Sequence, residues 1–154
     1  MTQEVLLTIS GLHAMEFTEN EDEGDEPIEV IAPASYYWKN GKHYIMYDEV
    51  VEGIPGVIKN KIKITGEDTL EIMKSGIINA HMVFEKNKMN VTYYDTPYGQ
   101  IHVGIHTREL EVDVSEELIG VEVIYGMDIN HEAVADCRIT LSIQPRKEAE
   151  SVLK

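Results

Sequence analysis

The sequence has little cysteine and no long apolar run. Its single cysteine, Cys137, cannot form a disulfide within the chain. The first residues, Met1-Thr2-Gln3-Glu4, lack the charged and then apolar pattern of a signal peptide. The apolar runs are far shorter than the ~20 residues that a helix needs to cross a bilayer. We therefore expect a cytoplasmic protein that has no membrane partner.

Positive charge is also scarce, because 13 Lys and Arg residues stand against 28 Asp and Glu residues, for a formal net charge of −15. This charge opposes the phosphate neutralisation that supplies most nucleic-acid affinity, so we expect no nucleic-acid partner. Six of the eight residues from Glu19 to Glu26 are acidic, which predicts an acidic loop at about 16–27. The spacing lacks the alternating ligand positions of a calcium loop, so a solvated loop is favoured over a cation site.

The abundant feature is alternation. From Lys42 to Gln144, apolar and polar residues alternate with period two, and short turn-forming clusters interrupt the pattern. This is typical of antiparallel strands joined by hairpins, since the connections are mostly too short for a helix. Asn40-Gly41 is the clearest hairpin turn because both residues tolerate positive φ. We expect strands over about 3–12, 28–38, 42–51, 59–64, 70–76, 78–84, 89–94, 101–112, 121–127 and 135–144.

These strands predict a single all-β domain over residues 1–154, with a short C-terminal tail at about 146–154. We expect a closed up-and-down antiparallel β-barrel of about 8–10 strands, since closure removes exposed strand edges. A β-sandwich is the alternative. The alternation also predicts interior side chains, among them Met82, Phe84, Met89, Tyr93 and Met127.

The order of several motifs resembles a known family. The motifs are Tyr44-Ile45-Met46-Tyr47-Asp48-Glu49, Leu70-Glu71-Ile72-Met73-Lys74-Ser75-Gly76 and Thr96-Pro97-Tyr98-Gly99, followed by Thr107 and Tyr125. Together they resemble the YwiB-like family, small bacterial proteins of unknown function with a calycin-like β-barrel, related in shape to lipocalins. The resemblance runs from the first strand to about Gln144 and implies a fold but no activity. The family usually has arginine where this chain has Lys74, which offers a point charge in place of a planar fork.

The alternation of side chains along each strand suggests a polar cluster inside the barrel, because it places Tyr47, Glu49 and Lys74 on inward faces. Two opposite charges inside a barrel need each other, so we expect Glu49 and Lys74 to form an ion pair near a barrel mouth. The alternative is a polar anchor in a ligand cavity, where Tyr47, Thr107 and Tyr125 add hydroxyl groups. The candidate ligand-binding residues are therefore Tyr47, Glu49, Lys74, Thr107 and Tyr125.

Catalytic and metal-binding patterns are weak. His102 and His106 share a strand face, but at ~3.4 Å per residue they lie about 13 Å apart, too far to hold one metal. His131-Glu132 begins a zinc-protease motif that lacks its second histidine, and Cys137 lies on an apolar strand face. We expect no metal, no cofactor and no catalytic residue, and therefore a protein that is not an enzyme.

Two functions are favoured, and an enzyme ranks last, with Glu49 and Tyr47 as the only inward polar set to test. The first is a non-enzymatic binding protein that holds a small, partly apolar ligand in the barrel. The second is a structural or interaction protein with a filled barrel, acting through its outer surface as a homodimer or with a partner. Outward apolar residues favour the second function, namely Leu6, Leu12, Ile77, Val83 and Ile124. A connected cavity of ~300 Å³ or more would favour the first.

Overall fold

The structure, a computed structural model, describes residues 3–11, 29–50, 53, 55–97, 99–116 and 118–145. The predicted acidic loop at about 16–27, the predicted tail at about 146–154 and Leu12 lie outside these residues. The side chains of Val134 and Ala135 are likewise not described.

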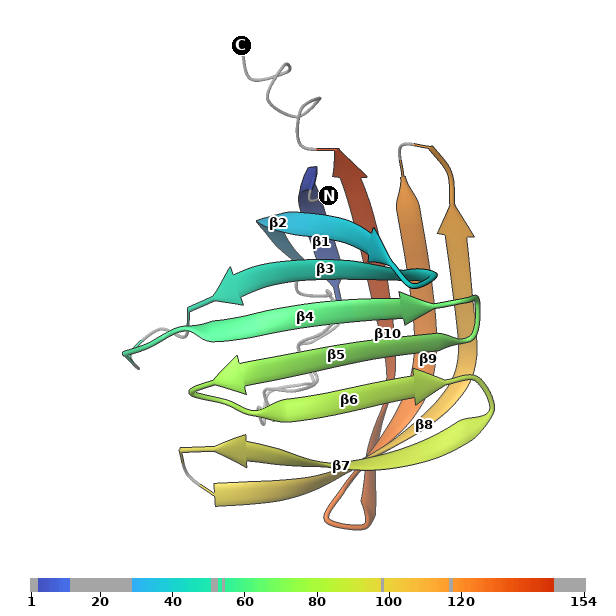
Figure 1. Ribbon diagram of the computed structural model, residues 1–154. Helices are drawn as coiled ribbons and strands as arrows, with labels where there is room; N and C mark the ends of the chain where they lie inside the picture. The colour runs from blue at the N-terminus through green and yellow to red at the C-terminus, as the bar shows by residue number, and fades with distance from the viewer. Residues whose placement is uncertain are drawn as a thin grey trace.

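The described residues form ten strands in a single antiparallel sheet. The strands are β1 Gln3–Ser10, β2 Glu29–Lys39, β3 Lys42–Glu49, β4 Ile58–Thr65, β5 Thr69–Gly76, β6 Ala80–Glu85, β7 Lys88–Thr96, β8 Gly99–Val114, β9 Ile119–Ile129 and β10 Glu132–Pro145. Hydrogen-bonded neighbours are also neighbours in sequence, except that β1 pairs with β10. The predicted up-and-down barrel is therefore confirmed (Figure 1).

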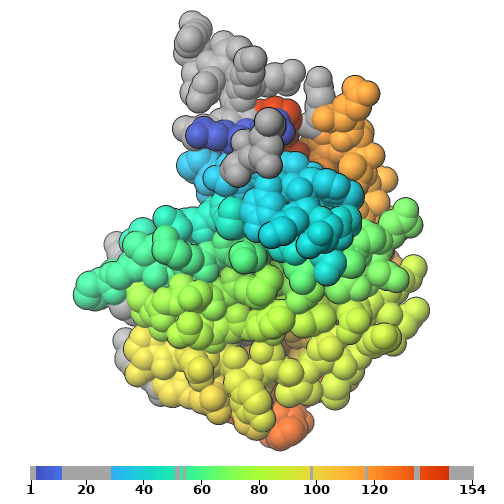
Figure 2. Space-filling model, viewed as in Figure 1, coloured from blue at the N-terminus to red at the C-terminus, as the bar shows by residue number. Residues whose placement is uncertain are grey.

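Strand β2 forms a corner between two layers. Its residues Glu29–Tyr36 pair with β1, whereas residues Ser35–Lys39 pair with β3. In Figure 1, β3 to β6 cross steeply in front of β1, β8, β9 and β10, and β2 bends to join the two layers. The side chains of β2 to β7 cover the front face in successive bands (Figure 2). The barrel is thus flattened, much as two sheets packed at a steep angle.

The barrel is nearly closed, with a seam between β6 and β7. An isolated bridge joins the two strands, with Asn79 N donating to Asp95 O at 3.0 Å and Asp95 N donating to Asn79 O at 2.8 Å. At the β6–β7 turn, Asn87 N donates to Thr107 O of β8, at 2.9 Å, and not back to β6. No other ladder joins β6 to β7 within the described residues.

Inward side chains fill the centre of the barrel. The predicted interior residues Met82, Phe84 and Met127 are buried, and the rings of Phe84 and Tyr125 make an edge contact with centroids 5.0 Å apart. Fully buried aliphatic side chains from most strands surround this pair, including Leu7, Ile45, Ile62, Leu70 and Ile105. A packed interior of this kind is common in small barrels.

The prediction for β7 is wrong, because Met89 and Tyr93 are 53% and 52% exposed and Tyr94 is buried. Alternation within β7 misleads, because the outward face carries Met89, Val91 and Tyr93, whereas the inward face carries Asn90, Thr92 and Tyr94. Pairing with β8 determines which face of β7 is inward, because Tyr94 lies opposite Ile101 and Thr92 lies opposite the buried Val103. Directly opposed side chains share a face, which turns Met89 and Tyr93 outward.

Glycine is required at two positions for different reasons. The predicted hairpin turn is confirmed, with Asn40 at φ 55° and Gly41 at φ 76°. Gly76 ends β5 at φ 135°, and a Cβ atom there would lie 2.3 Å from the carbonyl oxygen of Val57. Gly41 has open space around the same position. Of these two glycines, Gly76 is therefore the one restricted by both conformation and contact.

These two glycines provide a matched test of the fold. Replacing Gly41 with Ala should lower the free energy of unfolding by about 1 kcal/mol, the cost of a left-handed conformation. Gly76→Ala should cost at least about 3 kcal/mol, because the strained φ and the backbone clash add. Urea unfolding followed by circular dichroism measures both values. Equal losses in the two variants would contradict the close approach of β5 to Val57.

Candidate functional site

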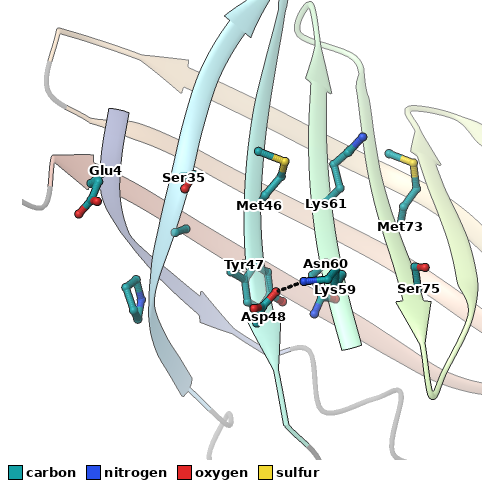
Figure 3. A pocket seen from close by; sticks show the side chains of 12 residues that line it. Glu4, Ser35, Met46, Tyr47, Asp48, Lys59, Asn60, Lys61, Met73 and Ser75 are labelled. Atoms are coloured by element: carbon teal, nitrogen blue, oxygen red, sulfur yellow. Dashed lines mark ion pairs between the residues drawn. The ribbon is translucent and has the colours of Figure 1, made fainter. Parts of the chain in front are cut away.

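A pocket of about 760 Å³ lies where β2 and β3 separate (Figure 3). The β2–β3 ladder ends at Ser35 and Met46, so Ala34 and Tyr47 are not paired across the two strands. Pro33 stands at this corner and has no N–H to donate to a ladder. On the N-terminal side of Ser35, β2 pairs with β1 and not with β3, which opens the wall of the barrel.

The pocket extends from the outer face of the sheet to buried residues. Ser35, Met46, Lys61 and Met73 are successive cross-strand partners on the outer face. Ala34, Tyr47 and Asn60 also line the pocket, and their side chains belong to the buried face. The apolar part of the lining is formed by Pro33, Ala34, Met46, Tyr47 and Met73.

Charged groups stand at the rim of the pocket. Asp48 and Lys59 are both exposed and form an ion pair at 3.5 Å, drawn as a dashed line in Figure 3. Glu4 and Lys61 complete the charged lining, and Ser75 adds a hydroxyl group. The site therefore combines an apolar body with a few polar groups, as small-molecule sites do.

A closed polar network lies behind the pocket. Lys74 Nζ donates to Glu49 Oε1 at 3.0 Å and to Asn60 Oδ1 at 2.9 Å, and Asn60 Nδ2 donates to Glu49 Oε1 at 3.1 Å. The Lys74 side chain is 5% exposed and that of Glu49 is 40% exposed. The predicted Glu49–Lys74 ion pair is confirmed, with one partner buried and the other reaching solvent.

Asn60 is one of the pocket residues that the sequence did not single out, as are Ser35, Met46, Lys61 and Met73. It is buried and lies directly opposite both Tyr47 of β3 and Lys74 of β5. A signal was present, because Asn60 is a polar residue in phase with the inward Ile58, Ile62 and Ile64. Its amide is oriented by the two charged neighbours, and it links their network to the pocket.

The five predicted site residues divide into two groups. Tyr47, Glu49 and Lys74 lie together at one end of the barrel, although Glu49 and Lys74 do not line the pocket. Burial raises the pKa of the Tyr47 phenol above its ordinary value of 10.0, and Glu49 and Tyr94 add to the shift. This phenol therefore stays neutral and offers its hydroxyl as a donor.

Thr107 and Tyr125 lie elsewhere, as direct cross-strand partners on β8 and β9. Both are buried, and their hydroxyl oxygens have no hydrogen-bond partner among the described residues. Burial raises the pKa of Tyr125, with a further contribution from Cys137, its neighbour on β10. Neither Thr107 nor Tyr125 lines the pocket, so they form a second polar position inside the packed core.

Two of the described histidines pair with carboxylates. His106 Nε2 lies 3.0 Å from Asp128 Oδ2, and His81 Nε2 lies 2.7 Å from Glu71 Oε1. In the described part of the chain, no group of three or more His, Cys, Asp or Glu residues is placed to hold a metal ion. The same part contains no helix long and apolar enough to cross a membrane.

The polar network should contribute to stability through Lys74. Lys74→Met leaves Asn60 Oδ1 without its donor and Glu49 without its counter-ion, so the free energy of unfolding should fall by about 2–3 kcal/mol. Glu49→Gln keeps an acceptor at the exposed end and should cost about 1 kcal/mol. Urea unfolding measures both values.

The control is Lys59→Met, which removes an exposed ion pair and should change stability by less than about 0.5 kcal/mol. A loss for Lys74→Met no larger than that for Lys59→Met would show that the network is energetically neutral.

Comparisons with known proteins agree with the fold. The chain is similar to a solved structure titled "Crystal structure of ywiB protein from Bacillus subtilis", with a TM-score of 0.74 and 19% identity, over 94% of this chain and 92% of that chain. It is 27% identical over 132 residues to the "Uncharacterized beta-barrel protein YwiB" of Bacillus subtilis (strain 168), which covers 86% of this chain and 88% of that protein. The family described as "Domain of unknown function (DUF1934)" matches residues 13–141. The YwiB-like resemblance is thus confirmed, and the chain belongs to the DUF1934 family of β-barrel proteins.

Proposed function

We propose that this protein is a non-enzymatic binding protein that holds one small, partly apolar ligand in the pocket between β2 and β3. The pocket volume of about 760 Å³ carries the proposal. It lies within the range of about 300–1,000 Å³ typical of small-molecule sites. The packed centre around Phe84 and Tyr125 favours the wall of the barrel over its interior as the place for the ligand.

The chemistry of the lining supports this proposal. Met46 and Met73 offer flexible, polarisable surface that adapts to ligands of different shape. Tyr47 and Asn60 supply hydrogen-bonding groups at the buried end, and the Asn60 amide is held in place by Glu49 and Lys74. A few oriented polar groups beside apolar surface give a ligand both affinity and orientation.

The location of the protein, its barrel type and its partner class are proposed from the sequence. We propose that the protein is cytoplasmic and that its barrel is of the calycin-like type. The net charge of −15 supports a small molecule over nucleic acid as the partner.

Blocking the opening tests the proposal. Ser35 stands where the β2–β3 ladder ends, so Ser35→Tyr places a ring across the opening. The control is Thr140→Tyr, at an exposed position on β10 outside the pocket. The probe is the uncharged dye N-phenyl-1-naphthylamine, whose fluorescence rises in apolar sites.

We expect saturable binding of one dye molecule per chain in the wild type and in Thr140→Tyr, and at least tenfold weaker binding in Ser35→Tyr. Unfolding midpoints should show that both variants are folded. Absence of saturable binding in the wild type, or equal binding in all three proteins, would overturn the proposal.

One observation favours a second function, interaction through the outer surface. Met89, Val91 and Tyr93 form an outward row on β7 and are 53%, 54% and 52% exposed. A contiguous apolar row on a strand is typical of an interface. The corresponding proposal is a homodimer that buries this row.

Sedimentation of the wild type and of Val91→Lys tests the homodimer. A charge in the centre of a buried apolar row should shift the dimer dissociation constant upward by at least tenfold. Val83→Lys, on neighbouring β6 and outside this row, is the control and should leave the dimer intact. A monomeric wild type at all concentrations would exclude this function.

A further inference from the structure

The charged residues of the pocket indicate the chemical class of ligand in the proposed function. Three lysines, at positions 59, 61 and 63, point outward along β4. Lys59 pairs with Asp48 at 3.5 Å, and Lys63 pairs with Glu71 at 3.6 Å. Lys61, between them, lies within 4 Å of no carboxylate of the described residues. Its nearest aromatic group is the Tyr44 ring, with Nζ 6.0 Å from the centroid.

Lys61 stands on the apolar lining of the pocket. Its direct cross-strand partners are Met46 on β3 and Met73 on β5, and all three residues are half-buried. Figure 3 shows the lysine side chain between the two methionines. The Lys61 side chain is thus partly buried beside apolar surface, so one amphiphile can contact its ammonium group and that surface together.

The other charges of the pocket are already engaged. Asp48 is held by Lys59 at the rim. Glu4 takes part in an interaction of its own. Lys61 is therefore the pocket cation that has no ion-pair partner among the described residues, in a chain whose formal net charge is −15.

We infer that the pocket binds a small anionic amphiphile. Its negative head group, a carboxylate, sulfonate or phosphate, would lie against Lys61 Nζ. Its apolar body would pack on Met46 and Met73 and enter between β2 and β3 toward Tyr47. This inference depends on the proposed function and adds the chemical class of the ligand and the residue that selects it.

Paired probes separate the charge from the pocket itself. The anionic probe is 1-anilinonaphthalene-8-sulfonate, and the uncharged probe of related shape is N-phenyl-1-naphthylamine. The test variant is Lys61→Met, which removes the charge and retains most of the side-chain volume. The matched control is Lys63→Met, which removes the same charge two residues along the same face, outside the pocket lining.

We expect Lys61→Met to weaken binding of the anionic probe at least tenfold and to change binding of the uncharged probe less than twofold. Lys63→Met should leave both affinities within twofold, and Lys61→Arg should retain anionic binding. Dodecanoate should displace the anionic probe and dodecanol should not, if the site accepts alkyl acids. Displacement by naphthalene-2-sulfonate alone would assign it to aromatic acids, with the anionic class unchanged.

Equal affinity of the wild type and Lys61→Met for the anionic probe would overturn the inference, as would equal losses in Lys61→Met and Lys63→Met. In both cases, retained binding of the uncharged probe would leave the proposed function standing. A wild type that binds neither probe would overturn both.

Discussion

The divided pairing of β2 is the constraint on which the rest of the structure depends. Residues Glu29–Tyr36 of β2 pair with β1, and residues Ser35–Lys39 pair with β3. Within β2, only Ser35 and Tyr36 are therefore paired with a strand on each side. A strand that changes partners must bend, and the bend sets the two layers of the barrel at a steep angle. The same bend ends the β2–β3 ladder and leaves the pocket in the wall.

The barrel has both a packed centre and a pocket in its wall. Phe84, Tyr125 and the surrounding aliphatic side chains fill the space between the layers, which stabilises the fold. The pocket lies to one side, and a self-satisfied network of Glu49, Asn60 and Lys74 separates it from the end of the barrel. A buried lysine is tolerated there because both neighbours accept hydrogen bonds from it. The network thus lets the wall pocket coexist with a packed core.

Lys61 differs from the other outward lysines of β4 in its electrostatic surroundings. Most cations of the outer β4 row are neutralised by carboxylates on the adjacent strands, as expected in a chain with more than twice as many acids as bases. Lys59 and Lys63 each have one acidic cross-strand partner, Asp48 and Glu71, whereas both cross-strand partners of Lys61 are methionines. The two methionines thus form apolar surface of the pocket beside a lysine that has no ion-pair partner among the described residues.

Local pattern determined much of this protein. Period-two alternation predicted the ten strands and the inward Glu49–Lys74 pair, and the Asn40-Gly41 dipeptide predicted its turn, because side-chain direction and turn conformation depend on a few neighbouring residues. Tertiary structure decided the outward face of β7, the partners of Asn60 and the existence of the pocket. Each of these depends on register between separate strands, and the pocket depends on where the β2–β3 ladder stops. Pairing over such distances is set by packing of the whole barrel, which no single segment of the sequence contains.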